Sequence, residues 1–170
     1  HYPLRRQRQM CIRDRFTKDQ EIAVHELIEF LAQPWDDKKY INALCGAGGT
    51  GKTFVIKYVI NNCKWSGGVI GCAAPTHKAC RVLSNSIGGK EVNTIQSLFG
   101  FRLDVNIENF DPENPAFNPV VKDKLDGLTV LIIYESSMLN AKLVNYISNK
   151  CKNCLLYTSP SPLDRQKSRM

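Results

Sequence analysis

The segment "GAGGTGKT", Gly46 to Thr53, is the part of the sequence that decides the fold. It fits the pattern G-x-x-x-x-G-K-[ST], in which glycines let the main chain curl so that successive N–H groups face phosphate oxygens. An apolar run from Tyr40 to Cys45 precedes it and a helical pattern over 52–62 follows, which is the context that supports this interpretation. The alternative is a glycine-rich turn with an incidental lysine.

The loop has the groups that a nucleoside triphosphate needs. Lys52 brings a mobile positive charge to the β- and γ-phosphates, and the hydroxyl of Thr53 can ligate Mg²⁺. The start of the following helix adds a favourable partial charge. We therefore predict a nucleotide site made of Gly46, Ala47, Gly48, Gly49, Thr50, Gly51, Lys52 and Thr53.

Strand and helix patterns alternate along the rest of the chain. Helical spacing runs from Thr17 to Pro34, and a short helix starts at Asn93 or Thr94. Further helices are predicted over 52–62, 77–86 and 139–149, and strands over 40–45, 69–74 and 129–133, while 104–119 is expected to be a long surface loop. This order predicts an α/β fold with a parallel sheet, whose ligands bind beyond the carboxyl ends of the strands.

The net charge of +7 belongs mostly to the two ends of the chain. Residues 1–15 carry +4 and residues 155–170 carry +2, which leaves +1 for 16–154 and gives no charge-based evidence for a nucleic-acid partner. Neither end has a periodic apolar pattern. We interpret 1–15 and 155–170 as irregular tails derived from sequencing adapters, with native disordered tails as the alternative, and 16–154 as the partial domain of a longer protein.

Composition excludes two classes of protein. No run approaches the roughly 18 apolar residues of a membrane span, so we expect no membrane partner. The seven cysteines are irregularly spaced, which favours reduced thiols and a cytoplasmic location over a disulfide framework.

Five short segments occur in an order that is typical of one family. They are "FTKDQ" (16–20), "GAGGTGKT" (46–53), "APTHKAC" (74–80), "NTIQSLFG" (93–100) and "LIIYESSM" (131–138). Together they resemble the first RecA-like ATPase domain of superfamily 1 DNA helicases, and most of all the RecD/Dda-like branch, whose members move along single-stranded DNA. The resemblance covers about 16–150 and implies a P-loop NTPase fold that uses ATP and Mg²⁺.

The resemblance also implies roles at the nucleotide site. Gln20 would contact the adenine edge, although Thr17-x-x-Gln20 is also a helix capping box, and one residue can do both. Lys52 and Glu135 would be the catalytic residues, with Glu135 positioning the attacking water. Thr53 and Glu135 would hold Mg²⁺.

Two segments match the DNA-contacting parts of the family. The first is Pro75, Thr76, His77 and Lys78, for which the alternative is a helix N-cap at Thr76 with a solvated lysine. The second includes Thr94 and Ser97, with Gln96 at a position where the family commonly has histidine. Phe99 and Phe101 are candidates for stacking on bases, and core packing is the alternative.

Tyr134 is a departure from the family, which has aspartate before the glutamate. A phenol does not carry the negative charge of a carboxylate at neutral pH and is a poor ligand for Mg²⁺. We therefore expect weak binding of nucleotide with Mg²⁺ and poor hydrolysis. Three explanations for Tyr134 compete. It is a sequencing error or recent mutation, the mark of a decayed non-hydrolysing paralogue, or part of an active variant that uses Glu135 alone.

The family likeness implies a second RecA-like domain that this chain lacks, and we expect the chain alone to be inactive for that reason too. We predict the ATP-binding domain of a DNA helicase from a bacterial cell or a phage-infected host. The alternatives are a nucleotide- or DNA-binding protein without turnover, and another P-loop enzyme such as a small kinase.

Overall fold

The computed structural model describes residues 16–32, 41–62, 69–151 and 155–159. They form a five-stranded sheet in the order β1-β5-β4-β2-β3, and every neighbouring pair is parallel. The strands are β1 (Ile41–Ala43), β2 (Val69–Ala74), β3 (Asn93–Thr94), β4 (Leu128–Tyr134) and β5 (Leu155–Ser159). The predicted α/β parallel-sheet fold is confirmed.

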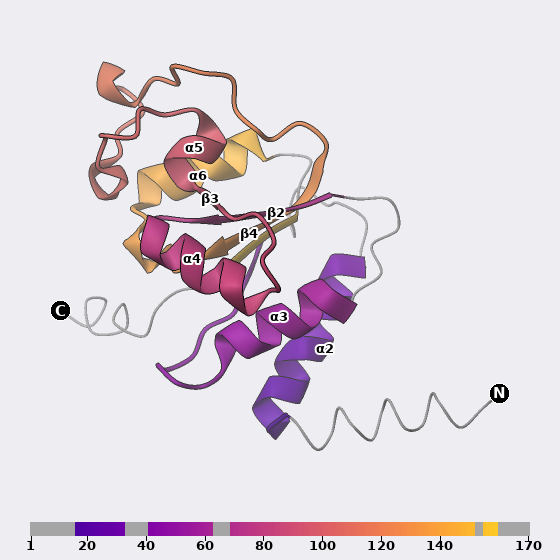
Figure 1. Ribbon diagram of the computed structural model, residues 1–170. Helices are drawn as coiled ribbons and strands as arrows, with labels where there is room; N and C mark the ends of the chain where they lie inside the picture. The colour runs from indigo at the N-terminus through magenta and orange to yellow at the C-terminus, as the bar shows by residue number, and fades with distance from the viewer. Residues whose placement is uncertain (1–15, 33–40, 63–68, 152–154, 160–170) are drawn as a thin grey trace.

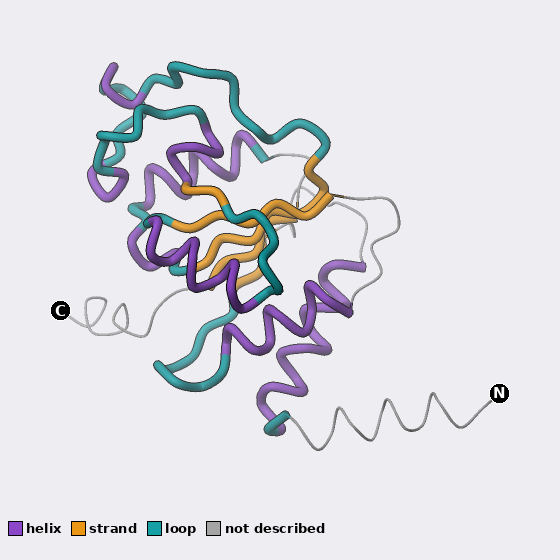
Figure 2. Tube along the Cα trace, viewed as in Figure 1, coloured by secondary structure: helices purple, strands orange, loops and turns teal. Residues whose placement is uncertain are grey.

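Helices cover both faces of this sheet, as Figures 1 and 2 show. They are α2 (Lys18–Ala32), α3 (Lys52–Asn62), α4 (His77–Ser86), α5 (Ile95–Phe99) and α6 (Ala141–Lys150), and three short 3₁₀ turns are η1 (Ile107–Asn109), η2 (Pro115–Phe117) and η3 (Ser136–Met138). The bounds of α3, β2 and α4 are those predicted from the sequence.

The alternation of side chains along β4 explains why helices pack on both faces of the sheet. Val130 and Ile132 pack with α2, α3 and α4, whereas Leu131 and Ile133 pack with α5, α6 and the segment after α5. All four side chains are almost fully buried. Because successive residues of a strand point to opposite faces, an unbroken apolar run is the pattern of a strand covered on both sides.

The segment 104–119 is more ordered than the predicted surface loop. Ile107, Phe110 and Phe117 are buried, and Phe110 lies 5.5 Å from Phe101 and 5.2 Å from Tyr146, measured between ring centroids. The expectation of a surface loop was wrong for these side chains, because an aromatic cluster under the segment buries enough apolar area to fix it.

Strand β5 corrects the predicted domain limits. Residues 155–159, which we assigned to an irregular C-terminal tail, pair with β1 on one side and with β4 on the other. Strands β1 and β4 both present main-chain donors and acceptors to the place between them, and β5 pairs with these groups. Tail residues 1–15 and 160–170 lie outside the described residues. Among the described helices, none is long and apolar enough to span a membrane.

Candidate functional site

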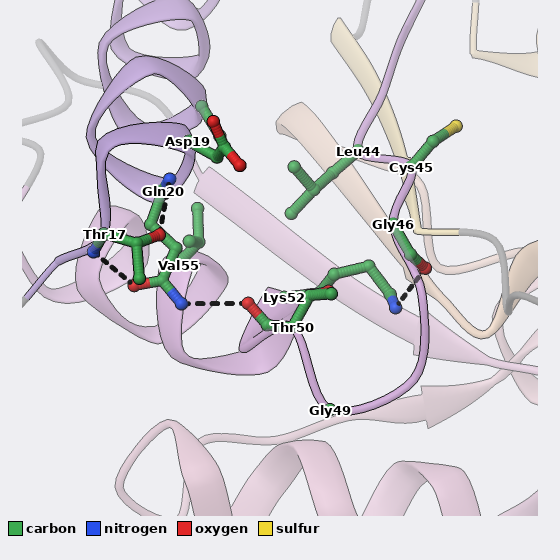
Figure 3. A pocket seen from close by; sticks show the side chains of 11 residues that line it. Thr17, Asp19, Gln20, Leu44, Cys45, Gly46, Gly49, Thr50, Lys52 and Val55 are labelled. Atoms are coloured by element: carbon green, nitrogen blue, oxygen red, sulfur yellow. Dashed lines mark hydrogen bonds between the residues drawn. The ribbon is translucent and has the colours of Figure 1, made fainter.

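The glycine-rich loop lies between β1 and α3, at the carboxyl edge of the parallel sheet. Gly49 and Gly51 adopt φ values of +78° and +82°, which residues with a Cβ rarely adopt. The loop borders a cavity of about 450 Å³ that Figure 3 shows from close by. This volume is in the range of small-molecule sites.

The capping box at the start of α2 is present, and it also contacts the loop. The N–H of Thr17 donates to Oε1 of Gln20 over 3.1 Å, and the N–H of Gln20 donates to Oγ1 of Thr17 over 3.3 Å. Nε2 of Gln20 donates to the carbonyl of Thr50 over 2.9 Å, as Figure 3 shows. Gln20 therefore ties the first helix to the loop, and its contact with adenine stays a prediction.

Lys52 folds back across the mouth of the loop. Its Nζ donates to the carbonyl of Gly46 over 2.8 Å and to that of Ala47 over 3.0 Å. The loop is tight at Gly46, because a Cβ there would lie 2.9 Å from Oγ1 of Thr50. The ammonium and the curled main chain make an arrangement that fits the terminal phosphates of a nucleotide.

Thr53 contacts the residue that replaces the expected aspartate. Its Oγ1 lies 3.2 Å from the hydroxyl of Tyr134, at the end of β4. The hydroxyl that the motif assigns to a cation is thus hydrogen-bonded to a neutral phenol. Among the described residues, no group of three histidines, cysteines, aspartates or glutamates could hold a metal ion. The two side chains at this point, Thr53 and Tyr134, offer hydroxyls rather than carboxylates, and such oxygens fit Mg²⁺ poorly.

Glu135 turns the chain out of β4 through an unusual conformation. Its φ of 58° and ψ of 44° are left-handed, and it is the one non-glycine residue with positive φ in the described part of the chain. Such conformations are strained and cluster at functional sites. Glu135 does not line the cavity around Lys52 but a second cavity of about 220 Å³, together with Thr76, Lys78 and Tyr134.

The first predicted DNA-contacting segment forms the start of α4. Thr76 is its N-cap, since its Oγ1 accepts from the N–H of Ala79 over 3.2 Å. Pro75 is buried, whereas His77 and Lys78 are exposed. The structural alternative for Thr76 is therefore confirmed, and the exposed pair stays a prediction for DNA contact.

The second segment is organised mainly by packing. Thr94 is buried and caps α5, with its Oγ1 accepting from the N–H of Ser97 over 3.1 Å. Phe99 and Phe101 are both buried in the core, so the stacking interpretation was wrong and the packing alternative holds. Oε1 of Gln96 is buried without a hydrogen-bond partner.

Sequence reasoning missed several residues that line the first cavity. Asp19, Leu44, Cys45 and Val55 line it beside Gln20 and Lys52. Leu44 and Cys45 directly precede the motif, so position in the chain was an available signal. Asp19 directly precedes Gln20 in the segment "FTKDQ", but its place at the cavity also depends on how α2 packs against α3.

Two comparisons relate this chain to known proteins. A family model described as the AAA domain matches residues 35–156. The chain belongs to the AAA domain family. This AAA domain is also 38% identical over 108 residues to the ATP-dependent DNA helicase dda of enterobacteria phage T4. The match covers 63% of this chain and 23% of that helicase.

These matches confirm the predicted resemblance to the first domain of superfamily 1 helicases of the Dda-like branch. The AAA domain is therefore a helicase-like ATPase domain. They give no support to the small kinase that was one alternative.

Proposed function

We propose that this AAA domain is the ATP-binding domain of a DNA helicase that couples ATP hydrolysis to translocation on single-stranded DNA. One observation carries the proposal. The cavity around Lys52 follows β1, and the cavity between Lys78 and Glu135 follows β2 and β4, so both open at the carboxyl edge of one parallel sheet. A nucleotide at the first and a DNA strand at the second would lie side by side.

The residues supply the necessary groups. Lys52 and the loop amides would hold the phosphates, and Gln20 would stay at the adenine side of the same cavity. Glu135 lines the second cavity, so it would have to reach the terminal phosphate from there to orient water when ATP is bound. Neutral Tyr134 beside Thr53 works against turnover, so we expect the domain as it stands to bind nucleotide and hydrolyse it poorly.

The DNA strand would contact the exposed start of α4. His77 and Lys78 are exposed, and Thr76 and Ser97 are partly exposed. A hydroxyl, an imidazole and an ammonium at a helix N-terminus suit a phosphate backbone. Buried Pro75 and Thr94 would shape this surface, as they hold the turns that present it.

Movement along DNA would need a second RecA-like domain in the intact protein, closing over the nucleotide held at Lys52. The match covers less than a quarter of the phage helicase, which is in keeping with such a longer protein. By analogy with that phage protein, we place the activity in the cytoplasm of a bacterial or phage-infected cell.

A second candidate function is nucleotide and DNA binding without turnover. The Thr53–Tyr134 hydrogen bond favours it, because the phenol takes the place of the carboxylate that helps hold a cation. Both candidates need the same nucleotide and DNA surfaces and differ only in hydrolysis.

Binding of a labelled oligothymidine tests the DNA part of the proposal. Fluorescence anisotropy should show binding of the single strand, and Lys78→Ala should weaken it and lower the salt dependence by about one phosphate contact. Lys57→Ala, which removes an exposed lysine from α3, is the control and should bind as the unchanged protein does. Nucleotide binding without any binding of the single strand would contradict the helicase proposal.

A further inference from the structure

Tyr134 is held in place by the core on one side and reaches the nucleotide loop on the other. Its ring packs against the buried cluster of Ala74, Ala79 and Cys80 and also against the apolar layer under α2 and α3. Its hydroxyl lies 3.2 Å from Oγ1 of Thr53. The ring is partly buried, so packing stabilises its contact with Thr53, while its open side borders the second cavity.

The contact between Tyr134 and Thr53 affects the cation that normally accompanies a nucleotide. A hard cation such as Mg²⁺ needs oxygen ligands at about 2.0–2.1 Å and favours anionic ones. At Thr53 the neighbouring oxygen is a neutral phenol that already shares a hydrogen bond with it. A cation would have to break that bond and push aside a ring fixed by packing.

The phosphate groups have no such obstacle. Lys52 and the curled main chain between Gly46 and Gly51 lie around the larger cavity, whose lining includes neither Thr53 nor Tyr134. The charge and the amide donors of this half do not depend on residue 134. The half of the site that would bind phosphates is therefore intact, whereas the side chain of Tyr134 closes the half that would hold the cation.

We propose that this site binds nucleoside diphosphates and triphosphates without a divalent cation, because Tyr134 occupies the position beside Thr53 that the cation would take. The inference rests on the proposed nucleotide site and goes beyond it. It assigns to Tyr134 the role of excluding the metal, with Lys52 as the remaining positive charge at the phosphates.

Nucleotide titrations in two buffers test the inference. A fluorescent ADP analogue is titrated into the whole chain with excess EDTA and then with magnesium chloride. Because Mg²⁺ complexes the free nucleotide in solution, a site that excludes the cation should bind the analogue more weakly with magnesium chloride than with EDTA, and we expect this of the unchanged protein. Tyr134→Asp should bind at least about tenfold more tightly with magnesium than with EDTA.

Tyr134→Phe is the matched control. It removes the hydroxyl and keeps the ring packed against Ala79 and Cys80, so magnesium should weaken its binding as it does that of the unchanged protein. Thermal unfolding followed by circular dichroism shows which variants are folded. If Tyr134→Asp fails to fold, the unchanged protein and the Phe variant still decide the question.

Each other outcome has one meaning. Equal or tighter binding with magnesium in the unchanged protein overturns the inference and leaves the proposed nucleotide site standing. A folded Tyr134→Asp variant that magnesium weakens as much as the unchanged protein also overturns it, since another feature would then exclude the cation. No binding in either buffer overturns both the inference and the proposed nucleotide site.

Discussion

The side-chain amide of Gln20 donates to the main-chain carbonyl of Thr50 over 2.9 Å, so a helix near the start of the chain fixes the loop 30 residues later. Gly51 makes this contact possible, because a Cβ there would lie 2.5 Å from Nε2 of Gln20. The loop and helix α2 therefore form one unit.

Gly51→Ala should destabilise the protein in two ways. The residue has φ of +82°, which costs a residue with a Cβ roughly 1–2 kcal/mol, and the lost Gln20–Thr50 bond adds about 1 kcal/mol. Urea unfolding measures the sum. Gly88→Ala is the matched control, since Gly88 has φ of +83° with nothing near its added Cβ. It should lose only the free energy that the positive φ costs a residue with a Cβ.

A double-mutant cycle isolates the contact between the two residues. In a Gln20→Ala background the amide is gone, so Gly51→Ala should cost about 1 kcal/mol less than it does in the unchanged protein. Strict additivity of the two changes would show that Gln20 does not hold the loop.

Gly100→Ala should be among the most damaging single changes in the chain. Gly100 ends α5 with φ of +73°, and its added Cβ would lie 2.1 Å from the main-chain carbonyl oxygen of Val121, which cannot rotate away. We expect a loss of more than about 3 kcal/mol of unfolding free energy. Gly127→Ala has a similar φ and open space, and should lose only about 1–2 kcal/mol. Equal losses in the two variants would contradict the close approach.

Cys45 should report nucleotide binding through its reactivity. It is exposed and lines the cavity beside Lys52, whereas Cys72, Cys80 and Cys151 are buried. Iodoacetamide followed by peptide mass spectrometry should show modification of Cys45 before these three, and ADP should slow it. In Lys52→Ala the slowing should disappear. Unchanged Cys45 reactivity at saturating nucleotide would place the ligand elsewhere.

Cys72 should make the stability fall in alkaline solution. Burial raises the pKa of its thiol from 9.0 to about 11, and Lys90 opposes this only in part. Between these pH values the unfolded chain has lost the proton and the folded protein retains it, so unfolding is increasingly favoured as pH rises. The shift corresponds to roughly 2–3 kcal/mol. In urea unfolding across this range, Cys72→Val should show a smaller fall than the unchanged protein; the same fall in both would show that other groups cause it.

Local patterns were enough to predict several elements. The helix from Lys52 to Asn62 and the strand from Val69 to Ala74 have the predicted bounds, because the glycine-rich loop, the two glycines before Val69 in the sequence and the apolar run are signals in adjacent residues. The capping role of Thr76 could be anticipated for the same reason.

Contacts between distant segments could not be predicted in this way. Strand β5 lies between β1 and β4, and its place in the sheet depends on pairing with these two distant segments. Phe110 is buried by residues before and after it in the chain, and Tyr134 meets Thr53 across 81 positions. The substitution at 134 was visible in the sequence, but its partner was not.

The central claim is that the loop from Gly46 to Thr53 binds nucleotide phosphates. The affinity of the Lys52→Ala variant for ADP tests this claim most directly. Isothermal titration with excess EDTA makes the result independent of the cation that Tyr134 is proposed to exclude. We predict that the unchanged protein and Lys57→Ala bind alike, while Lys52→Ala binds at least about tenfold more weakly and remains folded. Equal affinity of Lys52→Ala and the unchanged protein would contradict the claim.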